Sequence, residues 1–151
     1  MKTLNHALGR LGSYGPLIIR LILGVLFVLH GWDKFDTGLS NVEGFFASSG
    51  VPAAALTAPL VAIAEIVLGL ALIAGFATRI AALLLAGIMV GAIIWVKNES
   101  ILGGAELELA YLGGLIGLVF LGPGRLSVDE VMGSDTPLID IGRDQALDTA
   151  P

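Results

Sequence analysis

Four long apolar segments make up most of this chain and limit what it can fold into. They cover about residues 16–35, 52–76, 79–97 and 105–122. As helices rising about 1.5 Å per residue, segments of this length match a hydrocarbon core of about 30 Å. Lipid offers no hydrogen bonds to the backbone, and a helix satisfies its own N–H and C=O groups. The pattern therefore predicts an all-α fold, an integral membrane four-helix bundle.

The composition favours this interpretation over a soluble protein in which the second and third segments are buried helices. Of the 151 residues, 56% are hydrophobic and 14% are charged. A soluble domain has about 25% charged residues, and its apolar surface patches rarely exceed a few hundred Å². Four such segments in so short a chain are more apolar surface than a soluble fold can cover.

Two absences limit the chemistry. The chain has no cysteine, which excludes disulfides, iron–sulfur clusters and cysteine-bound zinc within it. No metal site is expected, and any electron carrier has to be a bound group or belong to a partner. There is also no run of basic residues, so nucleic acid is not an expected partner.

The polar ends divide the chain into three parts. We expect a leader at 1–15, the bundle at 16–122 and an acidic tail at 123–151. The basic residues outside the spans are unevenly distributed: Lys2, Arg10, Arg79, Arg125 and Arg143 lie on the side of the termini, and Lys34 and Lys97 on the other. Because cytoplasmic loops carry the excess of Lys and Arg, both termini are predicted to be cytoplasmic.

The first connection contains a helix signal. Ser40 and Glu43 have the spacing of a capping box, and Val42, Phe45 and Phe46 share one helical face. This predicts a short amphipathic helix in the first, outer loop, lying on the membrane surface or folding over the mouth of the bundle. A disordered loop is the alternative.

Turns and glycines supply further local predictions. Gly75 is expected to end the second span and Thr78 to cap the third, and a short helix is predicted to begin at Ser127, three residues before Glu130. Small residues allow close helix contacts in membranes. The glycines expected at such contacts are Gly24, Gly31, Gly87, Gly91, Gly113 and Gly117.

Ionisable side chains inside the spans are functional candidates, because each costs about 2.5–3.5 kcal/mol to insert. The candidate intramembrane polar site consists of Arg20, His30, Lys34, Glu65 and Glu106. Glu106 competes with Glu108, since residues two apart on a helix diverge by about 200° and only one can face the interior. Lys34 also fits an ordinary interface anchor.

Arg20 and Glu65 lie on antiparallel neighbours, so the guanidinium could reach the carboxylate. One interpretation is a structural ion pair that fixes the helix register. A second is a polar pocket for a small ligand or for protons, to which His30 could contribute because imidazole titrates near neutral pH. A third is that Arg20 extends to the membrane interface.

Three stretches, in this order and spacing, resemble the DoxX family of small bacterial membrane proteins over about residues 16–130. The first is RLILGVLFVLHGWDKF at 20–35, the second is EIVLG at 65–69 with GFATR at 75–79, and the third is GPGRLSVD at 122–129. The residues that match the family motifs are Gly24, Gly31, Gly69, Gly75, Arg79, Gly122, Gly124, Arg125, Ser127 and Asp129.

The resemblance implies a multi-pass protein of the bacterial inner membrane that serves an oxidoreductase system. Some members of the family are linked to quinone-dependent thiosulfate oxidation, and others to membrane-associated complexes that respond to oxidative or thiol stress. Quinone is thus the implied cofactor, soluble redox proteins on the cytoplasmic side are the implied partners, and an oligomer is compatible with it. Catalytic residues stay unassigned. Two alternatives remain open: a non-catalytic membrane scaffold, and a small proton-coupled transporter with Glu65 as its coupling carboxylate.

Overall fold

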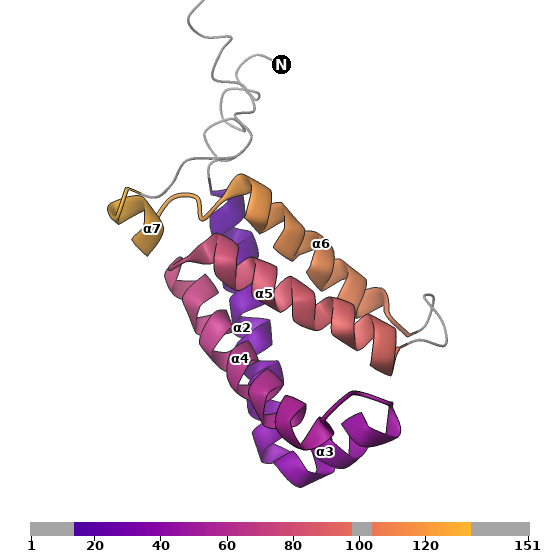
Figure 1. Ribbon diagram of the computed structural model, residues 1–151. Helices are drawn as coiled ribbons and strands as arrows, with labels where there is room; N and C mark the ends of the chain where they lie inside the picture. The colour runs from indigo at the N-terminus through magenta and orange to yellow at the C-terminus, as the bar shows by residue number, and fades with distance from the viewer. Residues whose placement is uncertain (1–13, 98–103, 134–151) are drawn as a thin grey trace, which may run out of the picture.

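The computed structural model describes residues 14–97 and 104–133, and these residues form helices joined by short connections (Figure 1). In chain order the elements are α2 (Gly15–Asp36), α3 (Leu39–Ser48), α4 (Ala54–Ala74), α5 (Thr78–Gly91), the π-helical segment η1 (Ala92–Val96), α6 (Glu106–Leu121) and α7 (Val128–Val131). Within these ranges the predicted all-α class is confirmed. The leader up to residue 13 and the tail after residue 133 lie outside the described residues.

Three of the described helices are long and apolar enough to cross a membrane by length and composition. They are α2, α4, and α5 continued through η1. The fourth predicted span corresponds to α6, which has 16 residues. At about 1.5 Å per residue it extends about 24 Å, which is shorter than a hydrocarbon core of about 30 Å, so the fourth crossing stays a prediction. α6 runs antiparallel beside α5 (Figure 1).

The packing of α2 against α4 depends on glycines. A Cβ on Gly24 would lie 2.7 Å from the carbonyl oxygen of Gly69, and one on Gly31 would lie 2.7 Å from that of Ala62. Only glycine permits such close backbones, as expected where lipid removes the hydrophobic drive for helix association. The sequence also predicted close helix contacts at Gly87, Gly113 and Gly117. That prediction is wrong within this chain, because a Cβ on any of these three would meet nothing within 4 Å.

The helices are apolar on their outer faces as well as in the core. Phe27, Leu72 and Leu115 are fully buried, whereas Leu56 and Leu83 are about three-fifths exposed. In water such a surface would aggregate, and in a bilayer it faces acyl chains. The helical bundle is therefore a membrane protein, as predicted.

The two ends of the bundle differ. Helix α3 lies across one end, and the beginning of α2, the end of α6 and α7 lie at the other (Figure 1). Helix α3 is the amphipathic helix predicted for the first loop, and Val42 is its buried residue. The predicted capping box is wrong, however: Gly38, with φ of 94°, is the N-cap, and no side chain caps the helix. Gly38 can enter this conformation because it has no Cβ.

Candidate functional site

The intramembrane polar side chains fall into two groups at opposite ends of the bundle. The sequence left open an ion pair between Arg20 and Glu65, and the structure contradicts that interpretation. Glu65 pairs with Lys34, whose Nζ lies 2.5 Å from Oε2 of Glu65. Arg20 makes its hydrogen bonds elsewhere, to backbone carbonyls. His30, Lys34 and Glu65 are thus brought together, and Arg20 is not part of this group.

The ion pair is largely shielded from solvent. Glu65, on α4, is 3% exposed, and the side chain of Lys34, on α2, is 19% exposed. Lys34 Nζ also lies 3.4 Å from the carbonyl oxygen of His30, one turn earlier on α2. Because a lone carboxylate inside a membrane is costly, Lys34 has a direct role in stabilising Glu65 in its buried position. It is more than an interface anchor.

A second polar contact joins α2 to α6. Nε2 of His30 lies 3.4 Å from the hydroxyl oxygen of Tyr111. The ring of Tyr111 also packs at a tilt on the buried ring of Phe27, with centroids 5.6 Å apart. Sequence reasoning did not identify Tyr111, because nothing in the apolar pattern of α6 distinguishes a tyrosine that faces the core from one at the interface.

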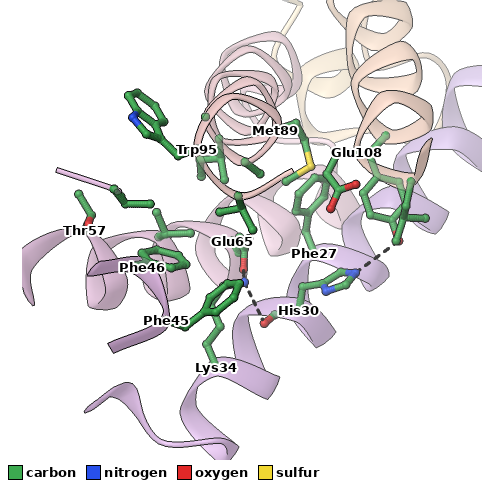
Figure 2. A pocket seen from close by; sticks show the side chains of 18 of the residues that line it. Phe27, His30, Lys34, Phe45, Phe46, Thr57, Glu65, Met89, Trp95 and Glu108 are labelled. Carbon is green, nitrogen blue, oxygen red and sulfur yellow. Dashed lines mark hydrogen bonds and ion pairs between the residues drawn. The ribbon is translucent and has the colours of Figure 1, made fainter. Parts of the chain in front are cut away.

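Both polar contacts open into one cavity. Its volume is about 440 Å³, within the usual range for small-molecule sites. Figure 2 shows the Lys34–Glu65 pair and His30 on its wall, with Phe45 and Phe46 of α3 nearby. Most of the remaining wall is apolar and comes from α4, the end of α5, η1 and α6. The cavity therefore offers a few hydrogen-bonding groups on an otherwise apolar surface.

The π-helical segment η1 forms one wall of this cavity. Ala92, Trp95 and Val96 line it. π-Helical turns occur mostly at functional sites, where the wider turn changes which side chains face a neighbour. The sequence predicts a continuous helix here, since an uninterrupted apolar run carries no mark of the altered hydrogen-bond pattern.

Of the two glutamates at the start of α6, the structure places Glu108 on the cavity wall. Glu106 is exposed and does not line the cavity. As expected, only one of the two glutamates faces the interior. The sequence candidate was Glu106, and the structure shows that it is Glu108 instead. The rotation of α6 about its axis decides between them, and its even distribution of apolar residues leaves that rotation undefined.

At the opposite end, Arg20 is fully buried and connects two distant parts of the chain. Its Nη1 donates to the carbonyl oxygens of Leu72 at 3.4 Å and Ile73 at 3.1 Å, in the last turn of α4. Its Nη2 donates to the carbonyl oxygens of Arg125, at 3.3 Å, and Leu126. The guanidinium thus joins the last turn of α4, where the Leu72 carbonyl also accepts the N–H of Gly75, to the segment before α7.

Asp129 completes this group of contacts. Its carboxylate accepts hydrogen bonds from the backbone N–H groups of Ala77, at 2.7 Å, and Thr78, at 2.9 Å. The prediction that Thr78 caps its own helix is wrong, because the Asp129 carboxylate from α7 does so, with the charge preferred at a helix N-terminus. The Thr78 hydroxyl has no hydrogen-bond partner among the described residues.

The glycine and serine predictions at this end are confirmed. Gly75 ends α4 in the left-handed conformation, with φ of 68°, and a Cβ there would collide with the guanidinium of Arg20. Ser127 caps α7 by accepting a hydrogen bond from the N–H of Glu130 at 3.0 Å. We call Arg20, Gly75, Ser127 and Asp129 the terminal lock.

The other family-motif positions lie close to the lock. Gly122 and Gly124 both have positive φ, and a Cβ on Gly124 would lie 2.9 Å from Pro16. The Arg125 guanidinium stands 5.5 Å from the centre of the Tyr14 ring. Arg79 lies in the first turn of α5. The glycines of the motif, together with Ser127 and Asp129, thus make contacts or turns within the fold.

A bundle of membrane helices with a mainly apolar cavity and an enclosed ion pair defines a small multi-pass membrane protein. The chain belongs to the DoxX family, whose model matches residues 15–98. No solved structure matches it.

Three curated relatives are similar to most of the chain. "Putative oxidoreductase CatD" of Bacillus subtilis is 36% identical over 116 residues, which are 76% of this chain and 84% of the relative. "Uncharacterized membrane protein Rv3486" of Mycobacterium tuberculosis is 36% identical over 132 residues, with 78% and 81% covered. "Inner membrane protein YqjF" of Escherichia coli is 33% identical over 129 residues, with 82% and 95% covered.

Proposed function

We propose that this DoxX protein is the membrane component of an oxidoreductase system and that it binds a quinone in the cavity described above. The observation that carries the proposal is the combination of a cavity of about 440 Å³, mainly apolar walls and the Lys34–Glu65 pair at its edge. The name of the Bacillus subtilis relative supports a redox role.

The groups on the cavity wall suit a quinone ring. A quinone presents two carbonyl oxygens, which accept hydrogen bonds, on a flat apolar ring. Lys34 has three N–H donors and uses two of them, on Glu65 and on the His30 carbonyl, so one remains for a ligand. Phe27, Phe45 and Trp95 supply aromatic surface against which such a ring can pack. Bound quinone would supply the electron transfer, and these residues would orient it.

A redox role needs a carrier from outside the chain. There is no cysteine, and the described residues contain no group of three or more His, Cys, Asp or Glu side chains able to hold a metal ion. A quinone drawn from the bilayer meets this need.

The proposal also includes a location and partners. The protein would lie in the bacterial inner membrane with its termini in the cytoplasm, as Arg79 and Arg125 near the terminal end favour. The cavity would then open in the outer half of the bilayer. Soluble redox proteins on the cytoplasmic side would be the partners that give electrons to the quinone or accept them from it, and the residues of the cavity would hold the quinone.

The test is co-purification of quinone with cavity-filling variants. Ala92→Phe places a ring in the cavity without touching the polar groups, and we expect bound quinone per protein to fall by about fivefold or more, equivalent to about 1 kcal/mol of binding. Leu84→Phe is the matched control, because Leu84 lies on the exposed face of α5 and outside the cavity.

Two results would overturn the proposal. One is wild-type protein that carries no quinone when it is extracted from quinone-containing membranes. The other is equal loss in Ala92→Phe and Leu84→Phe. Proton-gradient-driven flux in proteoliposomes that is abolished by Glu65→Gln would favour the transporter alternative instead.

A further inference from the structure

Contacts between helices close most sides of the cavity. Close glycine contacts and the Lys34–Glu65 pair hold α2 against α4, and the His30–Tyr111 contact joins α2 to α6. Helices α5 and α6 pack on each other, and η1 also packs on α6. Helix α3 packs on α4 and lies across the end of the bundle (Figure 1). These contacts leave the side between α4 and η1.

The side between α4 and η1 is open. Helices α4 and α5 diverge from the turn that joins them toward the end where α3 lies (Figure 1), and η1 packs on α5 and α6 rather than on α4. The cavity is nevertheless lined from both elements, by Thr57 and Val61 of α4 and by Ala92 and Trp95 of η1. Figure 2 shows Thr57 and Trp95 on the side of the cavity away from His30, and Trp95 is 40% exposed. The cavity therefore reaches the outside of the bundle here.

The residues around this gap suit a hydrocarbon chain. Val61, Ala92 and Trp95 are mainly apolar, and the Thr57 hydroxyl already donates to the carbonyl oxygen of Ala53 at 3.2 Å. A ligand that passed between α4 and η1 would thus meet apolar side chains. Because an opening on the flank of a membrane helix bundle faces acyl chains rather than water, such a ligand would come from the bilayer.

Gly91, the last residue of α5, leaves room at the gap. Its φ of −58° is helical, so the backbone does not require glycine. A Cβ on Gly91 would meet only the ring of Trp95, at 3.5 Å and 3.7 Å. Gly91 lines the cavity, whereas Gly87, one turn earlier, does not. The missing side chain therefore widens the cavity beside Trp95 and does not bring two helices together.

We infer that the ligand enters from the bilayer between α4 and η1, and that its isoprenoid chain lies in this gap beside Gly91. This rests on the proposed function and specifies its substrate class as quinones whose ring carries an apolar chain. A long-chain quinone is larger than a cavity of about 440 Å³, so its chain has to leave while the ring stays near Lys34. Between α4 and η1 the chain leaves without separating two packed helices. Gly91 is then a residue that determines which ligands fit.

The experiment compares a benzoquinone that has no chain with the same ring carrying a short isoprenoid chain. Each is titrated into the full-length protein in nanodiscs, and the amount taken up by empty nanodiscs is subtracted. Gly91→Leu places a side chain against Trp95, in the space assigned to the isoprenoid chain. Binding of the chain-bearing ligand is expected to fall about tenfold, equivalent to about 1.4 kcal/mol, whereas the ring alone is expected to bind as it does to wild-type protein.

Gly87→Leu is the matched control, since it makes the same change one turn earlier on α5, at an exposed position outside the cavity. It is expected to bind both ligands as wild-type protein does, and a thermal melt checks that each variant is folded. A second measurement needs no variant. It uses a ligand with a photoreactive diazirine on its chain, and the labelling that excess unlabelled ligand removes is expected on η1 and on α4 near Thr57.

The outcomes separate this inference from the proposed function. If neither ligand binds to wild-type protein, the proposed function fails. If both bind and Gly91→Leu weakens both equally, or weakens neither, the proposed function stands and the entry between α4 and η1 is overturned. The entry is also overturned if Gly87→Leu acts as Gly91→Leu does, or if the diazirine labels α2 and α6 instead.

Discussion

Glu65 lies in the middle of α4, where a carboxylate without a partner would have to leave the membrane interior or take up a proton. Lys34 provides the opposite charge at 2.5 Å, and the surrounding helices keep the carboxylate from solvent. In such a pair the loss of one partner is far more harmful than the loss of both, because only the single loss leaves an uncompensated buried charge.

The first prediction follows at the scale of residues. Lys34→Met is expected to lower the free energy of unfolding by about 3 kcal/mol or more, and the double variant Lys34→Met/Glu65→Leu is expected to recover most of that loss. Thermal unfolding in one detergent measures both variants. A double variant that is as unstable as Lys34→Met alone would contradict the view that the buried charge is the cause.

This pairing could not be predicted from the sequence, although both residues were candidates. Sequence shows that α2 and α4 are antiparallel, and it does not show their register. The structure places Gly24 opposite Gly69 and Gly31 opposite Ala62, which puts Glu65 opposite Val28. Along α2 that point is nearer to Lys34 than to Arg20, and the closer cation forms the pair.

At the scale of elements, the close contact between α2 and α4 sets the distance between the polar groups on the two helices. The contact needs backbones that approach until a Cβ would overlap a carbonyl oxygen. Since the cavity lies along the same helix pair, a change that separates these helices is expected to disturb both the fold and the ion pair.

The second prediction concerns this contact. Gly24→Ala inserts a methyl group 2.7 Å from the Gly69 carbonyl oxygen and should destabilise the protein by about 1–3 kcal/mol. Gly87→Ala is the control, because its methyl group would meet nothing within 4 Å and alanine favours helix by up to about 1 kcal/mol. Thermal unfolding compares the two variants, and equal destabilisation would rule out the steric explanation.

Most of the helices could be predicted at this scale, because an apolar run of fixed length bounded by polar residues, glycine and proline leaves few choices in lipid. The exceptions depend on contacts between elements. The π-helical η1 has no separate hydropathy signal. The cap on α5 comes from Asp129, far along the chain, so the local spacing that favours Thr78 is misleading.

At the scale of the whole molecule, the terminal lock and the cavity occupy opposite ends of the bundle. Through Arg20 the lock ties the end of α4 to the segment before α7, and through Asp129 it ties the start of α5 to α7. Its contacts are to backbone groups, and Arg20 does not line the cavity. This division implies that a substitution in the lock can lower stability without changing ligand binding. Variants of this kind can therefore distinguish a purely structural scaffold from a ligand-binding protein.

Arg20→Ala tests that division. It removes the only donor that reaches the carbonyl of Ile73 within the described residues and the donor to the carbonyls of the segment before α7, while the Leu72 carbonyl keeps the N–H of Gly75. A loss of about 3 kcal/mol or more is expected from these groups and the space left behind. The amount of protein in the membrane should fall, while quinone bound per folded protein should stay at the wild-type level.

Arg125→Ala is the matched control, because Arg20 contacts only the backbone carbonyl of Arg125, and this carbonyl survives the substitution. Western blots of membranes measure abundance, and quinone extraction from purified protein measures occupancy. Normal abundance with lost quinone would place Arg20 in the binding function and refute the separation of the two ends.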